Sequence, residues 1–433
     1  MTVPDTRSDP SAPRRSFVAR VLEVDGFAAM AREIEGTDSD PEGVGIMTRK
    51  ARIFPVRLDR VPLKAAPLLK QEMLSVGADS AHARGVADLS VEETPVVLIA
   101  TWGQYLRVIP KLRRQPFQLR PIANAVERAL RSYASRSPKV VRGAHRSFTV
   151  GNGTLVIGVV NVTPDSFSDG GRFLTTEAAV AHALRLEEEG AGLIDIGGES
   201  TRPGADPVDS VTEWSRIGPV LQALNDRLSV PISIDTYHAD VAAQAIAAGA
   251  DVVNDVTGLR DPEMRTVVSR TGAAAIVMHL RGTPKTMQDD PTYRDVRAEV
   301  FDALARATER AIADGVAADK LLIDPGLGFG KSAEASLELL AHAGELRSLG
   351  YPVVIGASRK SFLGSFLGGA PVGQREEAGI AAAVLAAFHG VQVIRTHDVA
   401  PTVRALKLVD AAIRLQQHPV GRSEIELLDE QDD

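Results

Sequence analysis

The sequence contains no cysteine among its 433 residues. This absence excludes disulfide bonds, thiolate metal ligands and a cysteine nucleophile, and it fits a reducing compartment. Long hydrophobic runs are also missing, because no stretch of about 18 apolar residues occurs anywhere in the chain. The first residues, MTVPDTRSDPSAPRRS, are polar and rich in proline, unlike a signal peptide. We therefore expect a cytoplasmic protein that does not enter a membrane.

An excess of positive charge is lacking as well. The chain has 49 Lys and Arg residues against 56 Asp and Glu residues, which gives a formal net charge of -7. Such a chain is poorly suited to bind the phosphate backbone of a nucleic acid, so we expect no nucleic-acid partner. The hydrophobic content of 44% and charged content of 24% are typical of folded globular proteins. The length exceeds one ordinary compact core and predicts either two domains or one large domain with an appendage.

The first third of the chain predicts a small α/β domain over residues 1–140. We expect residues 1–15 and 35–45, which are rich in Ser, Asp, Pro and Gly, to be mobile. The remaining hydrophobic patterns predict these elements: a strand and short helix in 16–34, a strand at 52–58, a helix at 63–76, a strand at 96–100, and helices at 104–114 and 119–133. The sequence does not indicate a role for this domain, and we expect Trp102 to be a packed aromatic residue.

The segment after this domain is basic and rich in turn residues, and it predicts a linker that leads into the next domain over residues 141–153. At the other end of the chain, residues 417–433 are acidic and poor in apolar residues. We expect this tail to be mobile.

Residues 154–416 alternate short β-branched runs with longer amphipathic ones, a pattern typical of repeated βα units. The eight expected strands are 156–161, 193–197, 232–235, 251–254, 274–279, 321–324, 352–356 and 391–395, and expected helices include 176–189, 211–228, 295–313 and 333–349. Eight such units in this length predict a (β/α)₈ TIM barrel, which is about 250 residues long. A doubly wound open sheet is the alternative.

Polar residues stand at or near the carboxyl end of every predicted strand: Asn161, Asp195, Asp235, Asn254, His279, Asp324, the Ser358-Arg359-Lys360 run, and Arg395 with His397. A single Asp or Asn at such a place is as readily a helix cap as a functional group. Capping does not explain Lys, Arg and His at the same ends. In a barrel these ends form the active-site face, so the complete set predicts a ligand-binding site.

The predicted site divides into two kinds of chemistry. Asp235, Asn254 and Asp324 offer acceptors beside an amide donor, which suits the row of N–H groups on a purine or pterin. The cationic side chains suit a phosphate or carboxylate group, and they are Lys360, Arg395, His397 and Arg202. We therefore expect a ligand with a heterocyclic end and an anionic end.

Three glycine-containing segments follow strands. Residues 161–171 and 197–205 are longer than ordinary βα loops, which have about 2 to 6 residues, and we expect them to close over substrate. The segment 324–331, DPGLGFGK, lacks the glycine spacing of a nucleotide-binding P-loop. We expect its glycines to let the backbone approach a flat ring, with Phe329 as an apolar wall.

Eight motifs in order carry a resemblance to a known family: GVVNVTPDSFSDGG (158–171), DIGGESTRPGA (195–205), SIDTY (233–237), NDVTGL (254–259), VMHLRGTPKTMQ (277–288), DPGLGFGK (324–331), GASRKSFLG (356–364) and RTHDV (395–399). On these residues the chain resembles the dihydropteroate synthases of the pterin-binding (β/α)₈ family. The resemblance covers residues 150–415 and departs from the family pattern at Leu280, where many members have methionine.

The resemblance implies a transferase that joins 4-aminobenzoate to 6-hydroxymethyl-7,8-dihydropterin diphosphate and releases diphosphate and 7,8-dihydropteroate. It implies three groups of site residues: Asp235, Asn254, Met278, Asp324 and Lys360 around the pterin; Asn161, Arg395 and His397 at the diphosphate, with Mg²⁺ held through Asn161; and Thr201, Arg202, Pro203, Phe167, Phe329 and Ser361 around the aminobenzoate. It also implies a homodimer.

Two other functions stay open within the same superfamily. A methyltransferase acting on methyltetrahydrofolate would share the acceptors but would not need the cations Lys360, Arg395 and His397. A pterin-binding protein without turnover is the second alternative, and both long loops, which read as intact, weigh against it.

Overall fold

The computed structural model describes residues 19–22, 24, 26–163, 176–199 and 207–417. The N-terminal residues 1–15 and the acidic tail, both expected to be mobile, lie outside the described residues apart from the last helical residue, 417. Within the described part, no helix combines the length and the apolar character needed to cross a membrane.

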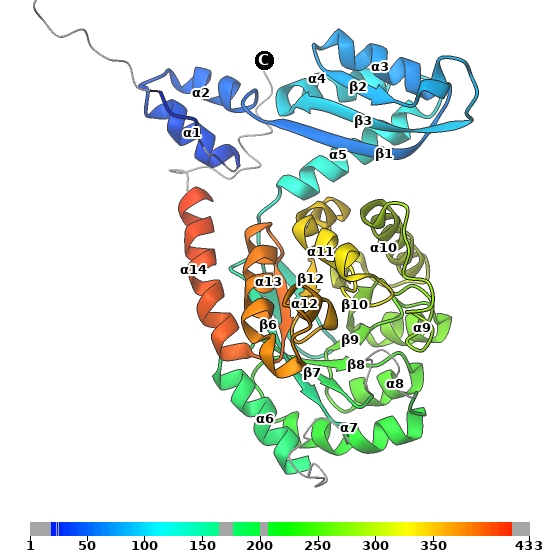
Figure 1. Cartoon of the computed structure of the whole chain (residues 1–433), viewed down its shortest axis with the longest axis vertical. Coiled ribbons are helices and arrows are strands. Elements are labelled where there is room, and N and C mark those ends of the chain that lie inside the picture. Colours follow the sequence, from blue (N-terminus) through cyan, green and yellow to red (C-terminus); the bar gives the residue numbers. More distant parts are fainter. Residues whose placement is uncertain (1–18, 23, 25, 164–175, 200–206, 418–433) are drawn as a thin grey trace, which may run out of the picture.

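The larger unit is a parallel eight-stranded barrel, as the alternating pattern predicted (Figure 1). Its strands are β6 (Leu155–Asn161), β7 (Leu193–Gly197), β8 (Ile232–Asp235), β9 (Val252–Asp255), β10 (Ala274–Met278), β11 (Leu321–Asp324), β12 (Val354–Gly356) and β13 (Val393–Thr396). They pair in the order β11-β10-β9-β8-β7-β6-β13-β12, and a parallel bridge between Ile323 and Val353 joins the two ends. The (β/α)₈ fold is therefore confirmed, and the open-sheet alternative is wrong.

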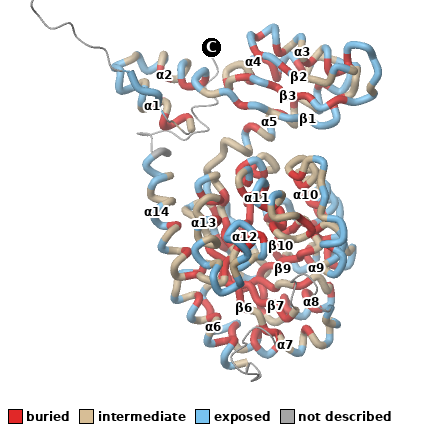
Figure 2. The backbone as a smooth tube through the Cα atoms, in the orientation of Figure 1, coloured by how far each residue is buried: buried red, intermediate tan, exposed pale blue. Residues whose placement is uncertain are grey.

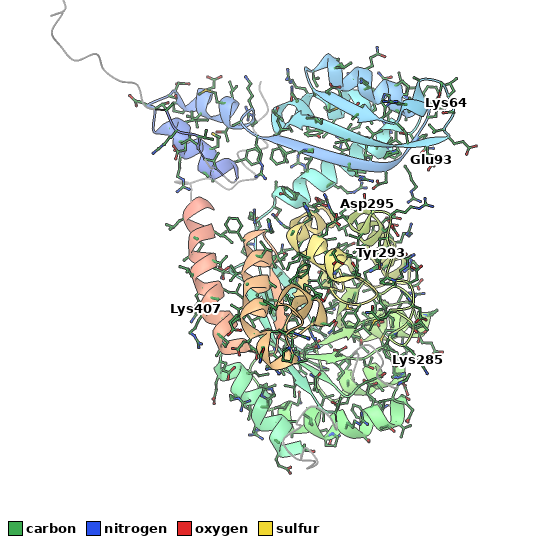
Figure 3. All side chains as sticks on the ribbon, in the orientation of Figure 1. Lys64, Glu93, Lys285, Tyr293, Asp295 and Lys407 are labelled. Carbon is green, nitrogen blue, oxygen red and sulfur yellow. The ribbon has the colours of Figure 1, made fainter. Side chains whose placement is uncertain are left out.

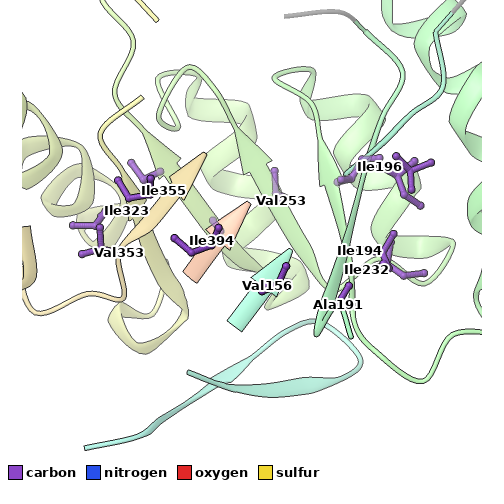
Figure 4. Packing of buried hydrophobic residues seen from close by; sticks show 14 of the residues in the cluster. Val156, Ala191, Ile194, Ile196, Ile232, Val253, Ile323, Val353, Ile355 and Ile394 are labelled. Carbon is purple, nitrogen blue, oxygen red and sulfur yellow. The ribbon is translucent and has the colours of Figure 1, made fainter. Parts of the chain in front are cut away.

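Helices surround this sheet: α6 (Thr176–Glu188), α7 (Ser210–Leu224), α8 (Ala239–Ala247), α9 (Pro262–Thr271), α10 (Val296–Ala313), α11 (Ala333–Ala341), α12 (Ser361–Phe366), α13 (Glu376–Phe388) and α14 (Val399–Gln417), with short 3-10 turns η2 (Ala318–Lys320), η3 (Ala343–Leu349) and η4 (Val372–Gln374). Alternate residues of each strand point to opposite sides of the sheet. Ile194, Ile232 and Ile394 therefore pack in the layer between strands and helices, which Figure 4 shows. Buried residues concentrate along the strands and on the inner sides of the helices (Figure 2).

One predicted helix, 333–349, is divided in two in the structure. The α-helix α11 ends at Ala341, and the 3-10 turn η3 follows from Ala343. A Cβ at Gly344 would stand 2.6 Å from the carbonyl oxygen of His389, so the chain passes too close to that carbonyl for a bulkier residue. The helical spacing of apolar residues in the sequence gives no information about this contact between distant segments.

The N-terminal unit is a three-stranded antiparallel sheet covered by helices, with strand order β1-β3-β2. Its elements are α1 (Phe27–Glu35), α2 (Pro41–Thr48), β1 (Ile53–Pro62), α3 (Ala65–Ser75), β2 (Asp79–His82), η1 (Arg84–Val86), β3 (Glu93–Thr101), α4 (Trp102–Leu112) and α5 (Leu119–Ala134). Trp102 is buried and packs edge-on against the rings of Phe27 and Phe54, as expected for a packed aromatic residue.

Two expectations for this unit are wrong. Residues 41–45, predicted to be part of a mobile loop, lie in α2, because Asp40 caps the helix by accepting a hydrogen bond from the Glu42 amide at 3.1 Å and Pro41 occupies the first turn. No strand precedes α1 among the described residues of 16–34. Strand β2 was not predicted, since four residues give too short a pattern.

The predicted linker contains a β-hairpin instead of an irregular connection. Strands β4 (Lys139–Arg142) and β5 (Ser147–Val150) pair in antiparallel fashion. Val141, Phe148 and Val150 pack against residues at the amino ends of the barrel strands, including Ile157 and Leu193. The hairpin therefore closes the end of the barrel opposite to the strand ends that carry the polar residues.

The basic residues of this hairpin are partly structural. Arg146 donates from Nε to Asp251 Oδ2 at 3.0 Å and from its other guanidinium nitrogens to the carbonyls of Leu228, Val230 and Gly249. Asp251 is fully buried, and its Oδ1 accepts from the backbone amide of Arg146 at 2.6 Å. These contacts fasten the turn of the hairpin to the start of β9.

The two units contact each other along α5 and η3. Arg347 is buried in η3, donates to the carbonyls of Tyr133 and Ser135, and lies 5.0 Å from the centroid of the Tyr133 ring. Further out, Arg57 of β1 pairs with Asp295 at 2.9 Å, and Figure 3 labels Asp295 at the edge of the barrel that faces the N-terminal unit. A buried arginine and exposed ion pairs thus join the units.

Candidate functional site

The carboxyl ends of the barrel strands bring the predicted acceptors and cations together. Asp235 ends β8, Asn254 lies in β9, Asp324 ends β11 and Arg395 lies in β13. Hydrogen bonds through Asp195 and Arg395 link Asp235 and Asn254 across strands that are far apart in the sequence. The site is therefore a product of barrel closure, as the predicted fold requires.

Arg395 stands at the centre of this network. Its Nε donates to Asp195 Oδ2 at 2.7 Å, and its Nη2 donates to Asp235 Oδ2 at 2.7 Å. Asn254 Nδ2 donates to the same Asp195 oxygen at 3.1 Å. One guanidinium thus fixes two carboxylates from neighbouring strands, and no described residue accepts a hydrogen bond from its Nη1.

Asp235 keeps an unused acceptor. Its Oδ1 is buried and has no hydrogen-bond partner among the described residues, while Oδ2 is paired with Arg395. Burial raises the pKa of Asp235 to about 7, against the lowering effect of the Arg395 charge. A buried acceptor without a donor costs free energy unless a ligand supplies one. Asp235 is therefore prepared to accept a hydrogen bond from a bound molecule.

Lys360 and Asp324 form the opposite side of the site. The Lys360 ammonium lies 4.5 Å from the centroid of the Phe329 ring and donates to the carbonyl of Leu327 at 2.6 Å. Burial lowers the pKa of Lys360 to about 8, although the Asp324 carboxylate works in the other direction. Burial also raises the pKa of Asp324, whose Oδ1 accepts from the Gly326 amide at 2.6 Å.

An apolar wall adjoins these polar groups. Val256, Met278, Leu280 and Met287 form a buried cluster, and the partly buried rings of Tyr237 and Phe329 pack against it. Met278 ends β10 and lies opposite Asp324 in the β10–β11 pairing. A flat ring can lie against this wall while its edge meets the carboxylates. Leu280, the position that departs from the family pattern, is part of the wall.

The glycine-rich segment 324–331 owes its composition to its own backbone. Gly326, Gly328 and Gly330 all have positive φ, and a Cβ at Gly326 would stand 2.1 Å from the carbonyl oxygen of His279. Lys331 points into the loop, where its Nζ donates to Gly326 O at 3.0 Å and Phe329 O at 2.9 Å. A lysine used in this way is not available to a nucleotide phosphate.

His279 completes the inside of this loop. Lys331 Nζ lies 2.9 Å from His279 Nδ1, and burial, followed by the Lys331 charge, lowers the pKa of His279. The imidazole is therefore neutral, and its Nδ1 accepts a hydrogen bond from Lys331 Nζ. His279 supports the loop, although it stood among the polar residues at strand ends.

Asn161 and His397 meet at the junction of β6 and β13. Asn161 Nδ2 lies 3.4 Å from His397 Nε2, and the Ser358 hydroxyl lies 3.2 Å from His397 Nδ1. The amide nitrogen of Asn161 thus faces the imidazole, which leaves its carboxamide oxygen available as a hard ligand. Of the residues predicted at the diphosphate, these two are adjacent, and Arg395 is engaged with carboxylates.

The turn that presents Lys360 has an unusual backbone. Arg359 has φ +62°, a left-handed conformation that a residue other than glycine adopts at a cost. Asp398 holds it, since Arg359 Nη2 donates to Asp398 Oδ1 at 2.5 Å and Nε to Oδ2 at 3.4 Å. Ser361 follows as the first residue of α12 and is exposed.

Four predicted site residues, Phe167, Thr201, Arg202 and Pro203, lie outside the described residues. Sequence reasoning also left functional contacts unassigned. Asp195 was noted at a strand end but given no role, although it is the buried partner of Arg395. The available signal was a single charged residue inside the otherwise apolar strand LIDIG. Ser358 and its contact with His397 gave no comparable signal.

Comparisons with known proteins agree with this geometry. Residues 157–397 match the family described as pterin binding enzyme. The chain is 41% identical over 263 residues to dihydropteroate synthase of Escherichia coli, covering 61% of this chain and 93% of that protein. It is similar in structure to Xanthomonas albilineans dihydropteroate synthase in complex with 7,8-dihydropteroate, with a TM-score of 0.58, 42% identity, and coverage of 63% of this chain and 98% of that one.

A longer match includes the N-terminal unit. The chain is 40% identical over 392 residues, 90% of its length, to a probable bifunctional folylpolyglutamate synthase/dihydropteroate synthase of Halobacterium salinarum. This match covers 46% of that protein, so the chain spans less than half of the length of this bifunctional relative. A match of this extent reaches beyond the barrel into the preceding residues.

Proposed function

The chain belongs to the pterin-binding enzyme family, and on this basis we propose that it is a dihydropteroate synthase. It would condense 6-hydroxymethyl-7,8-dihydropterin diphosphate with 4-aminobenzoate to give 7,8-dihydropteroate and diphosphate. One observation carries the proposal: Asp235, Asn254 and Asp324 converge beside the Lys360 ammonium and an apolar wall at the carboxyl ends of the strands.

The acceptors suit the edge of a pterin ring. A pterin presents N–H donors on its pyrimidine edge, and the free Oδ1 of Asp235 can accept one of them without breaking its other oxygen's bond to Arg395. Asn254 on the adjacent strand β9 and Asp324 on β11 offer further acceptors. Lys360 can donate to a ring carbonyl or ring nitrogen while it stays over Phe329. Met278 supports the face of the ring.

The anionic end of the substrate would lie toward Asn161 and His397. A Mg²⁺ ion prefers oxygen ligands and keeps several of its bound waters. One carboxamide oxygen from the protein, together with phosphate oxygens of the substrate, is therefore enough to hold it. The Asn161 oxygen fits this requirement because the Asn161 nitrogen faces His397. When bound, the ion would neutralise charge on the leaving diphosphate. His397 and the Nη1 atom of Arg395 would donate to the same group.

The reaction needs no nucleophile from the protein. The bond between the pterin methylene carbon and the diphosphate oxygen breaks, and its electron pair leaves with diphosphate. The amine nitrogen of 4-aminobenzoate then forms the new C–N bond and loses a proton to solvent. The protein positions both substrates, stabilises charge and excludes water. Phe167, Thr201, Arg202, Pro203, Phe329 and Ser361 would surround the aminobenzoate, as the family resemblance implies.

Release of diphosphate by the purified full chain is the deciding measurement. We expect release that depends on both Mg²⁺ and 4-aminobenzoate. Lys360→Ala should reduce turnover by at least about a hundredfold, since it removes a partly buried cationic donor from the substrate. Lys407→Ala is the matched control, because Lys407 is exposed on α14. Near-normal turnover of the Lys360 variant would disprove the site assignment.

The same assay separates the alternatives. Methyl transfer from methyltetrahydrofolate without diphosphate release would establish the methyltransferase, and ligand binding without turnover would establish a pterin-binding protein. Arg395→Ala is a second variant, which we also expect to be inactive. Its circular dichroism spectrum must match that of the parent, since Arg395 also pairs with two carboxylates.

A homodimer and a cytoplasmic location are parts of the proposal. The exposed apolar side chains of Phe388 on α13 and of Leu408 and Leu415 on α14 support an interface on these two helices. Light scattering after size-exclusion chromatography measures the mass directly. Leu408→Asp should convert a dimer into monomers, and a monomeric parent chain would refute the dimer.

A further inference from the structure

A second group of ligand-type side chains lies beside the acceptor site. Glu199 follows β7, Glu213 is in the first turn of α7, and His238 precedes α8. One carboxylate oxygen from each glutamate and one imidazole nitrogen lie within 4.8 Å of one another. None of these residues was assigned a role above, and Asp235 is three positions before His238.

Neighbouring hydroxyl groups orient both carboxylates. Thr236 Oγ1 donates to Glu213 Oε2 at 2.9 Å, and the Tyr237 hydroxyl donates to Glu199 Oε1 at 2.9 Å. Each glutamate therefore has one oxygen fixed from outside the cluster. Hydrogen bonds of this kind hold carboxylate ligands in place around protein-bound metals.

The second oxygen of each glutamate is buried without a partner. Among the described residues, neither Glu213 Oε1 nor Glu199 Oε2 has a hydrogen-bond partner, although Glu213 is 0% exposed and the Glu199 side chain is 7% exposed. Unpaired buried carboxylate oxygens are costly. Their position beside an imidazole points to a ligand that supplies positive charge.

The protein itself supplies little positive charge here. Among the described residues, no Lys or Arg lies within ion-pair distance of either carboxylate, and the closest such contact of Glu199 is to His238 Nε2 at 3.9 Å. The guanidinium of Arg216 donates to the Gly198 carbonyl at 2.7 Å and forms no ion pair with Glu199 among the described residues. Two adjacent buried carboxylates are thus left without a cation.

We propose that Glu199, Glu213 and His238 bind a divalent transition-metal ion of the Zn²⁺ type. Two carboxylates and one imidazole are ligands that Zn²⁺ accepts, and a water would complete the coordination. Ligand atoms lie about 2.0 to 2.2 Å from zinc, so the side chains would draw inward by roughly 1 Å. This site is separate from the oxygen-only magnesium site at Asn161, and the proposal does not depend on synthase activity.

An ion at this position would connect two consecutive βα units, β7–α7 and β8–α8. Its ligands come from the end of β7, the start of α7 and the start of α8. It would therefore stabilise the active-site face next to Asp235 by binding the folded state alone. We expect Zn²⁺ to raise the Tm of the full chain, and a chelator to reverse the increase.

Calorimetric titration of the chelator-treated full chain with Zn²⁺, with Mg²⁺ in excess, tests the site. We expect one equivalent to bind, and Glu213→Gln and His238→Gln each to weaken its Kd by at least about tenfold. His342→Gln is the matched control, because His342 also lies beside a carboxylate, Glu345 at 3.6 Å, but on the surface. This control should bind as the parent chain does.

Absence of the bound equivalent, or an unchanged Kd in both variants, would overturn the proposal in favour of two glutamates that share a proton. Co²⁺ gives a second readout on the unaltered chain, where visible absorption bands of low-coordinate cobalt are expected and their absence counts against the site. Should Glu213→Gln fail to fold, Glu199→Gln provides the same test on the other carboxylate. Retained binding in Asn161→Ala would show that the ion is not at the magnesium site.

Discussion

Lys360 is charged in surroundings that weaken its hold on the proton. Burial lowers the pKa of this ammonium to about 8, and the groups that face it are Asp324, Asp235 and Arg395. The charged form dominates below that pH, and the neutral amine dominates above it. Electrostatic help from Lys360 should therefore be present at neutral pH and be lost as the pH rises through about 8.

The expected outcome is an alkaline limb in kcat/KM for the pterin substrate with an apparent pKa of about 8. Lys360→Arg should move this limb upward, since arginine stays protonated, even if its activity is lower. Initial rates between pH 6 and pH 10, with Lys407→Ala for comparison, measure it. A limb at the same pH in the arginine variant would assign it to another group.

Asp195 is a residue whose importance comes from burial. It is 0% exposed and shares its Oδ2 between Arg395 and Asn254. Asp195→Asn removes one of the two charges that balance Arg395, so the free energy of unfolding should fall by about 3 kcal/mol. Urea denaturation measures this change, and the KM for the pterin substrate should rise because Arg395 and Asn254 lose a shared partner.

Ser233 provides the matched control for this change. It lies opposite Asp195 in the β7–β8 pairing, is equally buried, and its hydroxyl has no hydrogen-bond partner in the part of the chain that the structure describes. Ser233→Ala should leave stability within about 1 kcal/mol of the parent or increase it. A similar loss in both variants would mean that any change at this layer of the barrel is harmful, whatever its charge.

At the scale of elements, the β4–β5 hairpin closes the amino end of the barrel. Phe148 is 7% exposed and packs among the strand starts. Phe148→Ala should lower the free energy of unfolding by about 3 to 5 kcal/mol, because it leaves a cavity under the barrel. Val140→Ala, on the exposed side of the same hairpin at 58% exposure, should cost less than about 1 kcal/mol. Equal effects would show that the hairpin does not contribute to the core.

The elements also show where sequence patterns were sufficient. All eight barrel strands stand within two residues of their expected starts, since each is a short β-branched run between turn residues. The hairpin was missed because four-residue strands in a basic, turn-rich segment have no clear alternation. Helix α2 was missed because an Asp-Pro cap within a glycine-rich stretch reads as a loop.

For the whole molecule, the contact between α5 and η3 decides how the N-terminal unit is held. Arg347 is 3% exposed and donates to two carbonyls of the other unit. Arg347→Ala should destabilise the chain by about 3 kcal/mol, because it leaves those partly buried carbonyls without their donor. Urea unfolding followed by circular dichroism should show a loss of cooperativity between the units, and proteolysis near residues 135–138 should accelerate.

Arg60→Ala tests whether any charge across the boundary is equally important. Arg60 pairs with Asp302 at 3.3 Å, but its side chain is 65% exposed. An exposed pair of this kind contributes up to about 1 kcal/mol. A loss as large as that of the Arg347 variant would refute the special role of the buried arginine.

The sequence by itself determined the (β/α)₈ fold, the order of its strands and the positions of Asp235, Asn254, Asp324, Lys360 and Arg395 at one face. These properties follow from local hydrophobic period and from the geometry of parallel strands. Only the tertiary structure decided that Arg395 bridges Asp195 and Asp235, 200 and 160 residues away. It also decided that Lys331 turns into its own loop and that three unassigned residues meet beside Asp235. Such partnerships depend on distances between strands after closure, which no local pattern contains.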